Sequence, residues 1–272
     1  MEMMQSGKSK TVRGACLVGL GAVAVALAAF PPADGDERLL AGCDTLFVDC
    51  GDTHTLTANE EYDYVFIGQG GAVYTGGYTL KIKAAGGLLI EGAGLLNVSG
   101  AGGKVDLAGG GTHVIDGQVG LSTSTSVLEI STHAILGGAG RIKGFVAGAE
   151  VSVDSTKTLI SQMRIEGILT IAGTSDATTG KFVNRGLVIA DSASARILLE
   201  DLTYTGYGQW QVGPTSGTEI EFASDAKATQ LWGDFTVLDG TLDVNANVIT
   251  SGHLHWVDGT IDVASSVEFR AN

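Results

Sequence analysis

The chain has 272 residues, a formal net charge of -14, 44% hydrophobic residues, 41 glycines and only 3 prolines. This apolar content is too high for a chain kept disordered by its charge. The negative charge would repel the phosphates of a nucleic acid, so no nucleic-acid partner is expected.

Residues 1–28 have the pattern of a secretory signal peptide. Lys8, Lys10 and Arg13 precede an almost wholly small or apolar run at 15–30, and Ala26-Leu27-Ala28 fits the small-x-small cleavage rule. An uncleaved anchor is the alternative, but this run is short for a bilayer span. No second apolar run follows, so we expect an exported protein with no transmembrane anchor in its mature chain.

Residues 29–54 are interpreted as an N-terminal segment that precedes the repeats. Cys43 and Cys50 are the only cysteines after the predicted leader, and an even number in an oxidising compartment predicts a disulfide between them. The bridge would close a small loop over the open end of the repeats; two unpaired thiols are the alternative. Leu40-Ala41-Gly42-Cys43 also resembles a lipobox, and lipidation of Cys43 would anchor the protein to a membrane.

From residue 55 onward the chain alternates between short apolar strands and glycines. No window after the leader has the 3.6-residue apolar period of a helix. Five early strands are expected, at 64–67, 72–74, 79–83, 88–91 and 95–98. The pattern predicts an all-β domain over 55–272 with very little helix.

Three phrases in the middle of the chain resemble a known repeat type. They are Ala134-Ile135-Leu136-Gly137-Gly138-Ala139-Gly140-Arg141-Ile142-Lys143-Gly144-Phe145-Val146, Glu166-Gly167-Ile168-Leu169-Thr170-Ile171-Ala172-Gly173 and Phe182-Val183-Asn184-Arg185-Gly186. Each resembles repeats of secreted bacterial surface proteins, such as autotransporter passenger domains and haemagglutinin-like adhesins. The resemblance implies a right-handed, single-stranded parallel β-helix, secreted or on a bacterial cell surface.

The clearest repeat lies near the C-terminus. Leu238-Asp239-Gly240-Thr241-Leu242-Asp243-Val244 returns nineteen positions later as Val257-Asp258-Gly259-Thr260-Ile261-Asp262-Val263, and Val248 then aligns with Val267. A period near twenty residues is typical of a solenoid, and the chain is long enough for about ten coils. Four inward columns are expected: Trp210, Phe235 and Leu254; Val212, Val237 and Trp256; Ile220, Leu242 and Ile261; and Phe222, Val244 and Val263.

The residues between these positions should point outward and place acids in one column. Glu221, Asp243 and Asp262 would lie on neighbouring strands, where like charges destabilise a sheet. A bound Ca²⁺ would relieve that repulsion, and screening by salt is the alternative. No other cofactor is expected.

Other polar residues have weaker claims to chemistry. Asp239 and Asp258 could join the acids as a catalytic carboxylate pair, but Asp-Gly is also a favoured turn sequence. His253 and His255 share one strand face and would need a third metal ligand, such as His113, His133 or an aspartate. No catalytic residue is assigned.

Three functions fit this sequence. The first is an exported structural or adhesive β-solenoid. Its partners would be extracellular glycans or other surface proteins, and its open strand edges would favour end-to-end self-association. Tyrosines expected to point outward could stack on sugars: Tyr62, Tyr64, Tyr74, Tyr78, Tyr204 and Tyr207. The alternatives are a polysaccharide-active β-helix enzyme, either lyase or hydrolase, and a fragment of a larger adhesin.

Overall fold

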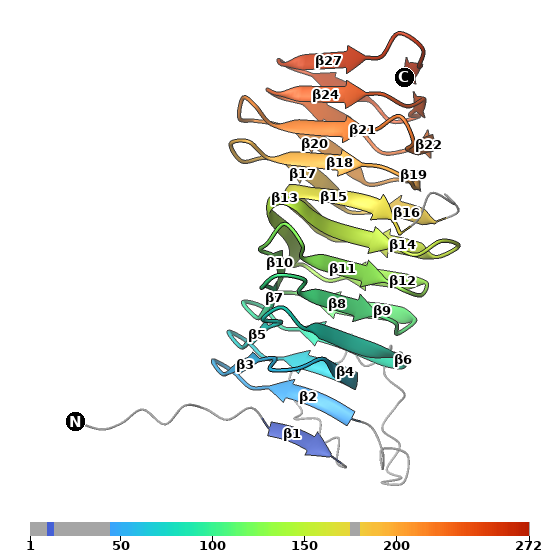
Figure 1. Cartoon of the computed structure of the whole chain (residues 1–272). Coiled ribbons are helices and arrows are strands. Elements are labelled where there is room, and N and C mark those ends of the chain that lie inside the picture. The colour runs from blue at the N-terminus through green and yellow to red at the C-terminus, as the bar shows by residue number, and fades with distance from the viewer. Residues whose placement is uncertain (1–9, 14–43, 175–179, 272) are drawn as a thin grey trace, which may run out of the picture.

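Parallel strands stack into a β-solenoid of about 10 turns in the computed structural model, which describes residues 10–13, 44–174 and 180–271 (Figure 1). Every regular element in those residues is a strand. In the same residues, no helix is present that could span a membrane. The all-β solenoid predicted from the sequence is therefore confirmed.

Strand pairing divides each coil among three walls, which we call A, B and C. Wall A contains β3 (Thr53–Thr55), β5 (Ala72–Tyr74), β7 (Leu95–Val98), β10 (Gln118–Leu121), the first parts of β13 (Arg141–Val153) and β15 (Arg164–Gly173), β17 (Leu187–Ala190), β20 (Gln209–Val212), β23 (Phe235–Val237) and β26 (Leu254–Trp256). All of these neighbours pair in parallel.

Wall B follows wall A along the chain. It contains the first parts of β4 (Glu60–Ile67) and β6 (Thr79–Ile90), then β8 (Lys104–Leu107), β11 (Val127–Ile130), the second parts of β13 and β15, β18 (Arg196–Leu199), β21 (Glu219–Phe222), β24 (Thr241–Val244) and β27 (Thr260–Val263).

Wall C completes the coil. It contains β2 (Asp44–Val48), the second parts of β4 and β6, β9 (Gly111–Ile115), β12 (Ala134–Gly137), β14 (Thr158–Ser161), β16 (Lys181–Asn184), β19 (Thr203–Gly206), β22 (Lys227–Leu231), β25 (Val248–Ile249) and β28 (Phe269–Arg270).

The stack begins earlier than residue 55. Strands β2 and β3 pair in parallel with β4 and β5, so residues from Asp44 onward already belong to the coils. The short strand β1 (Lys10–Arg13) pairs antiparallel with β2. The rest of the predicted leader and Cys43 lie outside the described residues, while Cys50 is exposed. The signal peptide, the disulfide and lipidation therefore stay predictions.

All four inward columns expected from the C-terminal repeat are present in the strand register. Phe235 pairs with Trp210 on one side and Leu254 on the other, and Leu242 pairs with Ile220 and Ile261. The alignment of Val248 with Val267 is wrong, because Val248 pairs with Phe269. The turn after β27 is two residues longer than the turn after β24, which shifts the pairing by two positions.

The lumen is filled by side chains that alternate with outward ones along each strand, as the pleat requires. Its C-terminal half contains a connected aromatic group, in which Trp210 lies 5.6 Å from Phe222 and 6.0 Å from Phe235 between ring centroids. Tyr204 is wholly buried in this group and donates to the carbonyl oxygens of Ile171 and Glu200. Burial raises its pKa well above the usual value.

Glycines form a column at the corner that leads into wall A. A Cβ on Gly117 would lie 2.2 Å from the carbonyl oxygen of Gly94, and one on Gly140 would lie 2.0 Å from that of Gly117. No side chain fits at such distances, so glycine here permits close approach of successive coils.

His113 is an inward polar residue on β9. Its Nδ1 accepts the backbone N–H of Leu88 at 3.2 Å, and its Nε2 lies 3.1 Å from the carbonyl oxygen of Gly109. This pair of contacts requires the neutral ring with its proton on Nε2. Burial lowers the pKa of His113 below its ordinary value.

The glycine column gives a prediction with a matched control. Gly140→Ala should lower the free energy of unfolding by about 2 kcal/mol or more, because the new Cβ overlaps the Gly117 carbonyl oxygen. Gly92 has open space around its Cβ position, so Gly92→Ala should stay within about 0.5 kcal/mol of the native chain. Urea unfolding measures both, and equal costs would contradict the close-approach explanation.

The His113 contacts predict a pH effect on stability. The pKa of His113 in the folded state is below 6.5, so the unfolded chain binds the proton more readily. The stability that neutral His113 contributes is therefore complete above pH 6.5 and is lost as the pH falls. His113→Asn keeps an acceptor for Leu88 and does not titrate. We expect the variant to lose less stability than the native chain between pH 7 and pH 5 in urea titrations. A parallel loss in both proteins would show that His113 is not responsible.

Candidate functional site

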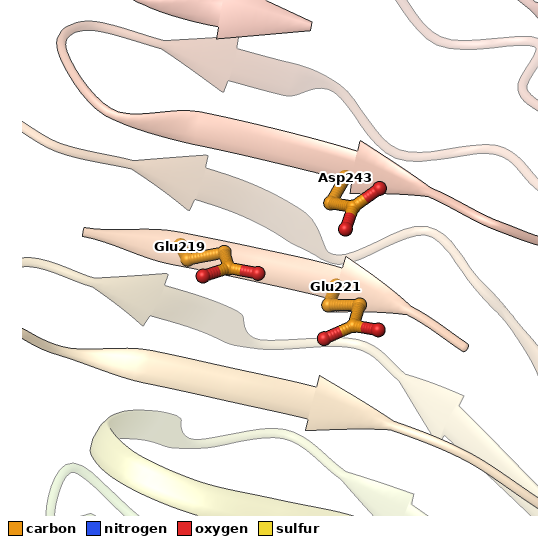
Figure 2. A group of neighbouring side chains, drawn as sticks. All are labelled: Glu219, Glu221 and Asp243. Carbon is orange, nitrogen blue, oxygen red and sulfur yellow. The ribbon is translucent and has the colours of Figure 1, made fainter. Parts of the chain in front are cut away.

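Three carboxylates gather on the outer surface of wall B near the C-terminal end. Glu219 and Glu221 lie on β21 and Asp243 on β24, and Figure 2 shows all three side chains on the same side of these strands. One oxygen from each lies within 4.8 Å of the others. The parallel register causes this arrangement, because Glu221 pairs directly with Asp243. We call these residues the acidic group.

Arg196 on β18 supplies a positive charge to the acidic group from the preceding coil. It pairs in register with Glu219, and its Nε lies 3.5 Å from that carboxylate. Its Nη2 donates to Glu221, which also accepts a hydrogen bond from Asn245 at 3.4 Å. One guanidinium thus contacts two of the three carboxylates. The hydrogen bond to Glu221 raises the pKa of Arg196.

The acidic group remains under electrostatic strain despite Arg196. Partial burial raises the pKa of Glu219, and nearby Glu221 and Asp243 add to this effect while Arg196 opposes it. Partial burial also raises the pKa of Asp243, with smaller contributions from Glu221 and Asp262. Raised carboxyl pKa values mean that ionisation disfavours the folded state, so these two groups reduce stability as the pH rises through their pKa values.

Two of the three predicted calcium ligands belong to this group. Glu221 and Asp243 are brought together as expected, whereas Asp262 pairs with Asp243 on the next strand and is not part of the compact set. Sequence reasoning missed Glu219 and Arg196. The alternation within Glu219-Ile220-Glu221 could have revealed Glu219, because both acids flank an inward residue. Calcium binding stays a prediction.

The two Asp-Gly pairs lie between strands, at turns. Gly240 and Gly259 have φ angles of 122° and 85°, which residues other than glycine rarely adopt. The Asp258 carboxylate accepts the N–H of Gly259 at 2.8 Å, which is a local turn contact. The turn interpretation therefore accounts for this motif.

The histidines that could bind a transition metal do not form one site, because His253 and His255 lie at wall A and His113 lies on wall C. His253 and His255 lie with ring centroids 6.0 Å apart, and His253 Nδ1 is 3.4 Å from Asp234. His113 is buried on wall C, where both of its nitrogens are occupied. Among the described residues, the compact metal-ligating groups do not include a histidine.

A second ionic cluster lies on wall A. Glu166 is buried beneath three cations, with Arg141 Nη1 at 3.3 Å, Lys143 Nζ at 3.5 Å and Arg164 also in contact. Arg164 reaches Asp191 as well. Arg141 and Arg164 line an open hollow of about 720 Å³ together with glycines of the corner column. Glu166 occupies an outward position on β15 but is covered by neighbouring side chains. Its ion pairs compensate the charge that is buried there.

Exposed aromatic residues are fewer than the sequence suggested. Tyr62 and Tyr204 are buried in the lumen, so the expectation that they point outward is wrong. Tyr207 is exposed and stacks on Trp232, with ring centroids 4.9 Å apart. This pair lies just after β19 and β22 on adjacent coils.

Comparison of the chain with models of protein families, with curated proteins and with solved structures finds no match. The fold defines the class: the chain is a parallel β-solenoid.

The contact between Arg196 and the acidic group predicts how the protein responds to calcium. Arg196→Gln should lower the thermal midpoint in chelator, by the equivalent of about 0.5 kcal/mol, because the carboxylates lose their cation. Millimolar Ca²⁺ should then raise the midpoint of Arg196→Gln more than that of the native chain, since the ion replaces the lost charge.

Arg141→Gln is the control, because it removes an arginine from wall A and leaves the acidic group intact. Differential scanning fluorimetry with Ca²⁺ and with chelator provides the measurement. Equal calcium responses in the two variants, or no response in any protein, would refute the calcium hypothesis.

Proposed function

We propose that this chain is an exported structural or adhesive protein that acts as a β-solenoid rod outside the cell or on its surface. The observation that carries this proposal is the stack of parallel strands that the described residues form between Asp44 and Arg270, whose lumen is occupied mainly by apolar side chains. A continuous rod of this kind presents its outward side chains along three long walls. Such extended surfaces are what solenoid proteins use for binding.

Export is supported by the leader pattern of residues 1–28. The phrases that resemble bacterial surface repeats also lie within the coils, on β12, β13, β15 and β16. The resemblance of these phrases to repeats of passenger domains and haemagglutinin-like adhesins is the support for the proposed placement at a bacterial surface.

An adhesive role is supported by the exposed Tyr207–Trp232 pair. Tyrosine and tryptophan combine an apolar ring with a polar group and are enriched in binding surfaces. Extracellular glycans and other surface proteins are the proposed partners. Retention of a glycan without its cleavage would be the corresponding activity.

Export can be tested with the full chain expressed in a secreting bacterium. We expect the native protein outside the cytoplasm with an N-terminus after Ala28, and we expect Leu20→Arg to remain inside, because a charge interrupts the apolar run. Asp34→Asn lies beyond the run and should be exported normally. N-terminal sequencing of fractionated cells checks these outcomes, and export of Leu20→Arg would contradict the leader assignment.

The exported protein can then be applied to immobilised neutral glycans and polyuronates. Retention without new reducing ends or unsaturated products is the expected result, and Tyr207→Ala should weaken retention. Cleavage by the native chain would contradict the structural or adhesive function.

A polysaccharide-active enzyme is the second candidate because of the acidic group. Glu219 and Asp243 both have raised pKa values, and a carboxyl group that keeps its proton can act as a general acid. Their close approach resembles the paired carboxylates that glycosidases require. Cleavage that disappears in Asp243→Asn would favour this function.

A further inference from the structure

The open hollow beside the ionic cluster of wall A extends along the rod over successive coils. Its volume of about 720 Å³ is within the usual range for sites that bind small molecules. Three corners that lead into wall A line it with Ala93-Gly94, Asp116-Gly117 and Ala139-Gly140. The outward positions that open β7, β10, β13 and β15 complete it with Leu95, Gln118, Arg141 and Arg164, which are neighbours in the strand register.

Backbone packing keeps this hollow open. A Cβ on Gly117 or on Gly140 would overlap a carbonyl oxygen of the preceding coil, so no side chain can extend into the hollow from these positions. At the next corner Gln162 and Met163 replace the small residues, and the hollow ends there at Arg164.

Arg141 lines the hollow with a guanidinium that is held in a fixed orientation. Its Nε donates to Oε1 of Gln118 at 2.8 Å on the preceding coil, and its Nη1 lies 3.3 Å from Glu166 on the following coil. Neither contact uses Nη2, so this nitrogen keeps two N–H donors for a ligand. A group that is already oriented loses less entropy when it binds.

The charges beside the hollow favour an anionic group. Arg141, Lys143 and Arg164 provide three cations beside the carboxylates of Glu166 and Asp191. The Glu166 side chain is 3% exposed, whereas those of Arg141 and Arg164 are 48% and 38% exposed. A ligand therefore meets the guanidinium groups before the buried carboxylate, and a guanidinium binds a carboxylate through paired hydrogen bonds.

Asp116 adds an acceptor for hydroxyl groups to the same hollow. One of its carboxylate oxygens, Oδ1, accepts the N–H of Ala139 at 2.8 Å, which leaves Oδ2 to accept a hydroxyl proton. Of the described residues that line the hollow, none is aromatic. The affinity for a sugar here has to come from polar and ionic contacts.

We propose that this hollow binds an acidic sugar, with the sugar carboxylate on Arg141 and a ring hydroxyl on Asp116. The ligand class is a uronic-acid residue of a polysaccharide, because such a residue carries both groups on one ring. The formal net charge of -14 repels polyanions at long range, so retention of such a chain requires a local cationic site. The acidic-sugar site rests on the proposed adhesive function and gives it a glycan class.

Two variants test the charge and the space of the hollow separately. Arg141→Gln should weaken binding about tenfold, as expected for the loss of a charge-assisted hydrogen bond. Ala139 is exposed, so Ala139→Leu fills part of the hollow without removing an ion pair. It should also weaken binding about tenfold, because the added side chain occupies space that the sugar needs.

Each variant has a matched control. Lys104→Gln removes a cation from wall B, where Lys104 contacts Glu129, and should bind like the native chain. Ala147→Leu adds the same bulk at an exposed position of β13 outside the hollow and should also bind like the native chain. Thermal midpoints show that each variant is folded.

Isothermal titration calorimetry of the full chain with trimers of galacturonate, glucuronate and mannuronate measures the affinities. The methyl ester of each trimer is the matched ligand without charge. Binding of a trimer but not of its ester, weakened in both hollow variants and unchanged in both controls, supports the proposal. No binding of any trimer, equal binding of an ester, or native affinity in either hollow variant would overturn it.

Failure of the acidic-sugar site can be told apart from failure of the adhesive function. A native chain that is retained on no immobilised glycan contradicts the adhesive function. Retention on glycans that is unchanged in Arg141→Gln and Ala139→Leu contradicts the acidic-sugar site alone.

Discussion

The structure depends on the close parallel stacking of each coil upon the previous one. Backbone hydrogen bonds set adjacent strands about 4.8 Å apart, so every inward side chain contacts its equivalents in the neighbouring coils. The corner glycines show how strict this is, because the carbonyl of Gly117 occupies the space where a Cβ on Gly140 would lie. Extra residues are accommodated at a corner in the shift of pairing between Phe145 and Glu150 on β13, and within wall C as a single extra residue between Ala228 and Gln230 on β22.

The same stacking determines the electrostatics of the outer walls. A repeat that carries an acid at one outward position places acids on adjacent strands, as with Glu221, Asp243 and Asp262. Cations from neighbouring positions offset part of this repulsion: Arg196 contacts Glu219 and Glu221, and Arg164 bridges Glu166 and Asp191. A column of acids is therefore first a consequence of repetition, and its chemistry depends on which cation lies beside it.

The sequence predicted the inward columns of the C-terminal coils although the loops between them differ in length: Phe235 follows Trp210 by 25 residues, and Leu254 follows Phe235 by 19. From Trp210 to Val263 a simple alignment gave the correct inward columns, because side-chain direction alternates strictly along a strand. The pairing of Val248 failed because a longer turn precedes Phe269. A regular spacing of 23 residues, visible in Gly71, Gly94, Gly117 and Gly140, is a further sequence signal that marks the wall A corner directly.

The candidate site was harder to predict, because its parts come from coils with different sequences. Asp243 lies in the Asp-Gly-Thr repeat, but Arg196 belongs to a strand without that motif and reaches the acids through the side-chain conformation it adopts. Buried Tyr204 shows the same limit, because an aromatic residue in a strand can point inward or outward and the sequence does not say which until the strand register is known.

In a solenoid each inward side chain is constrained by its equivalents in the coils on either side, whereas outward residues vary with little effect on packing. Sequence repetition therefore identifies the core efficiently, and functional differences concentrate at outward positions, at the corners and at the end coils, where repetition is least informative.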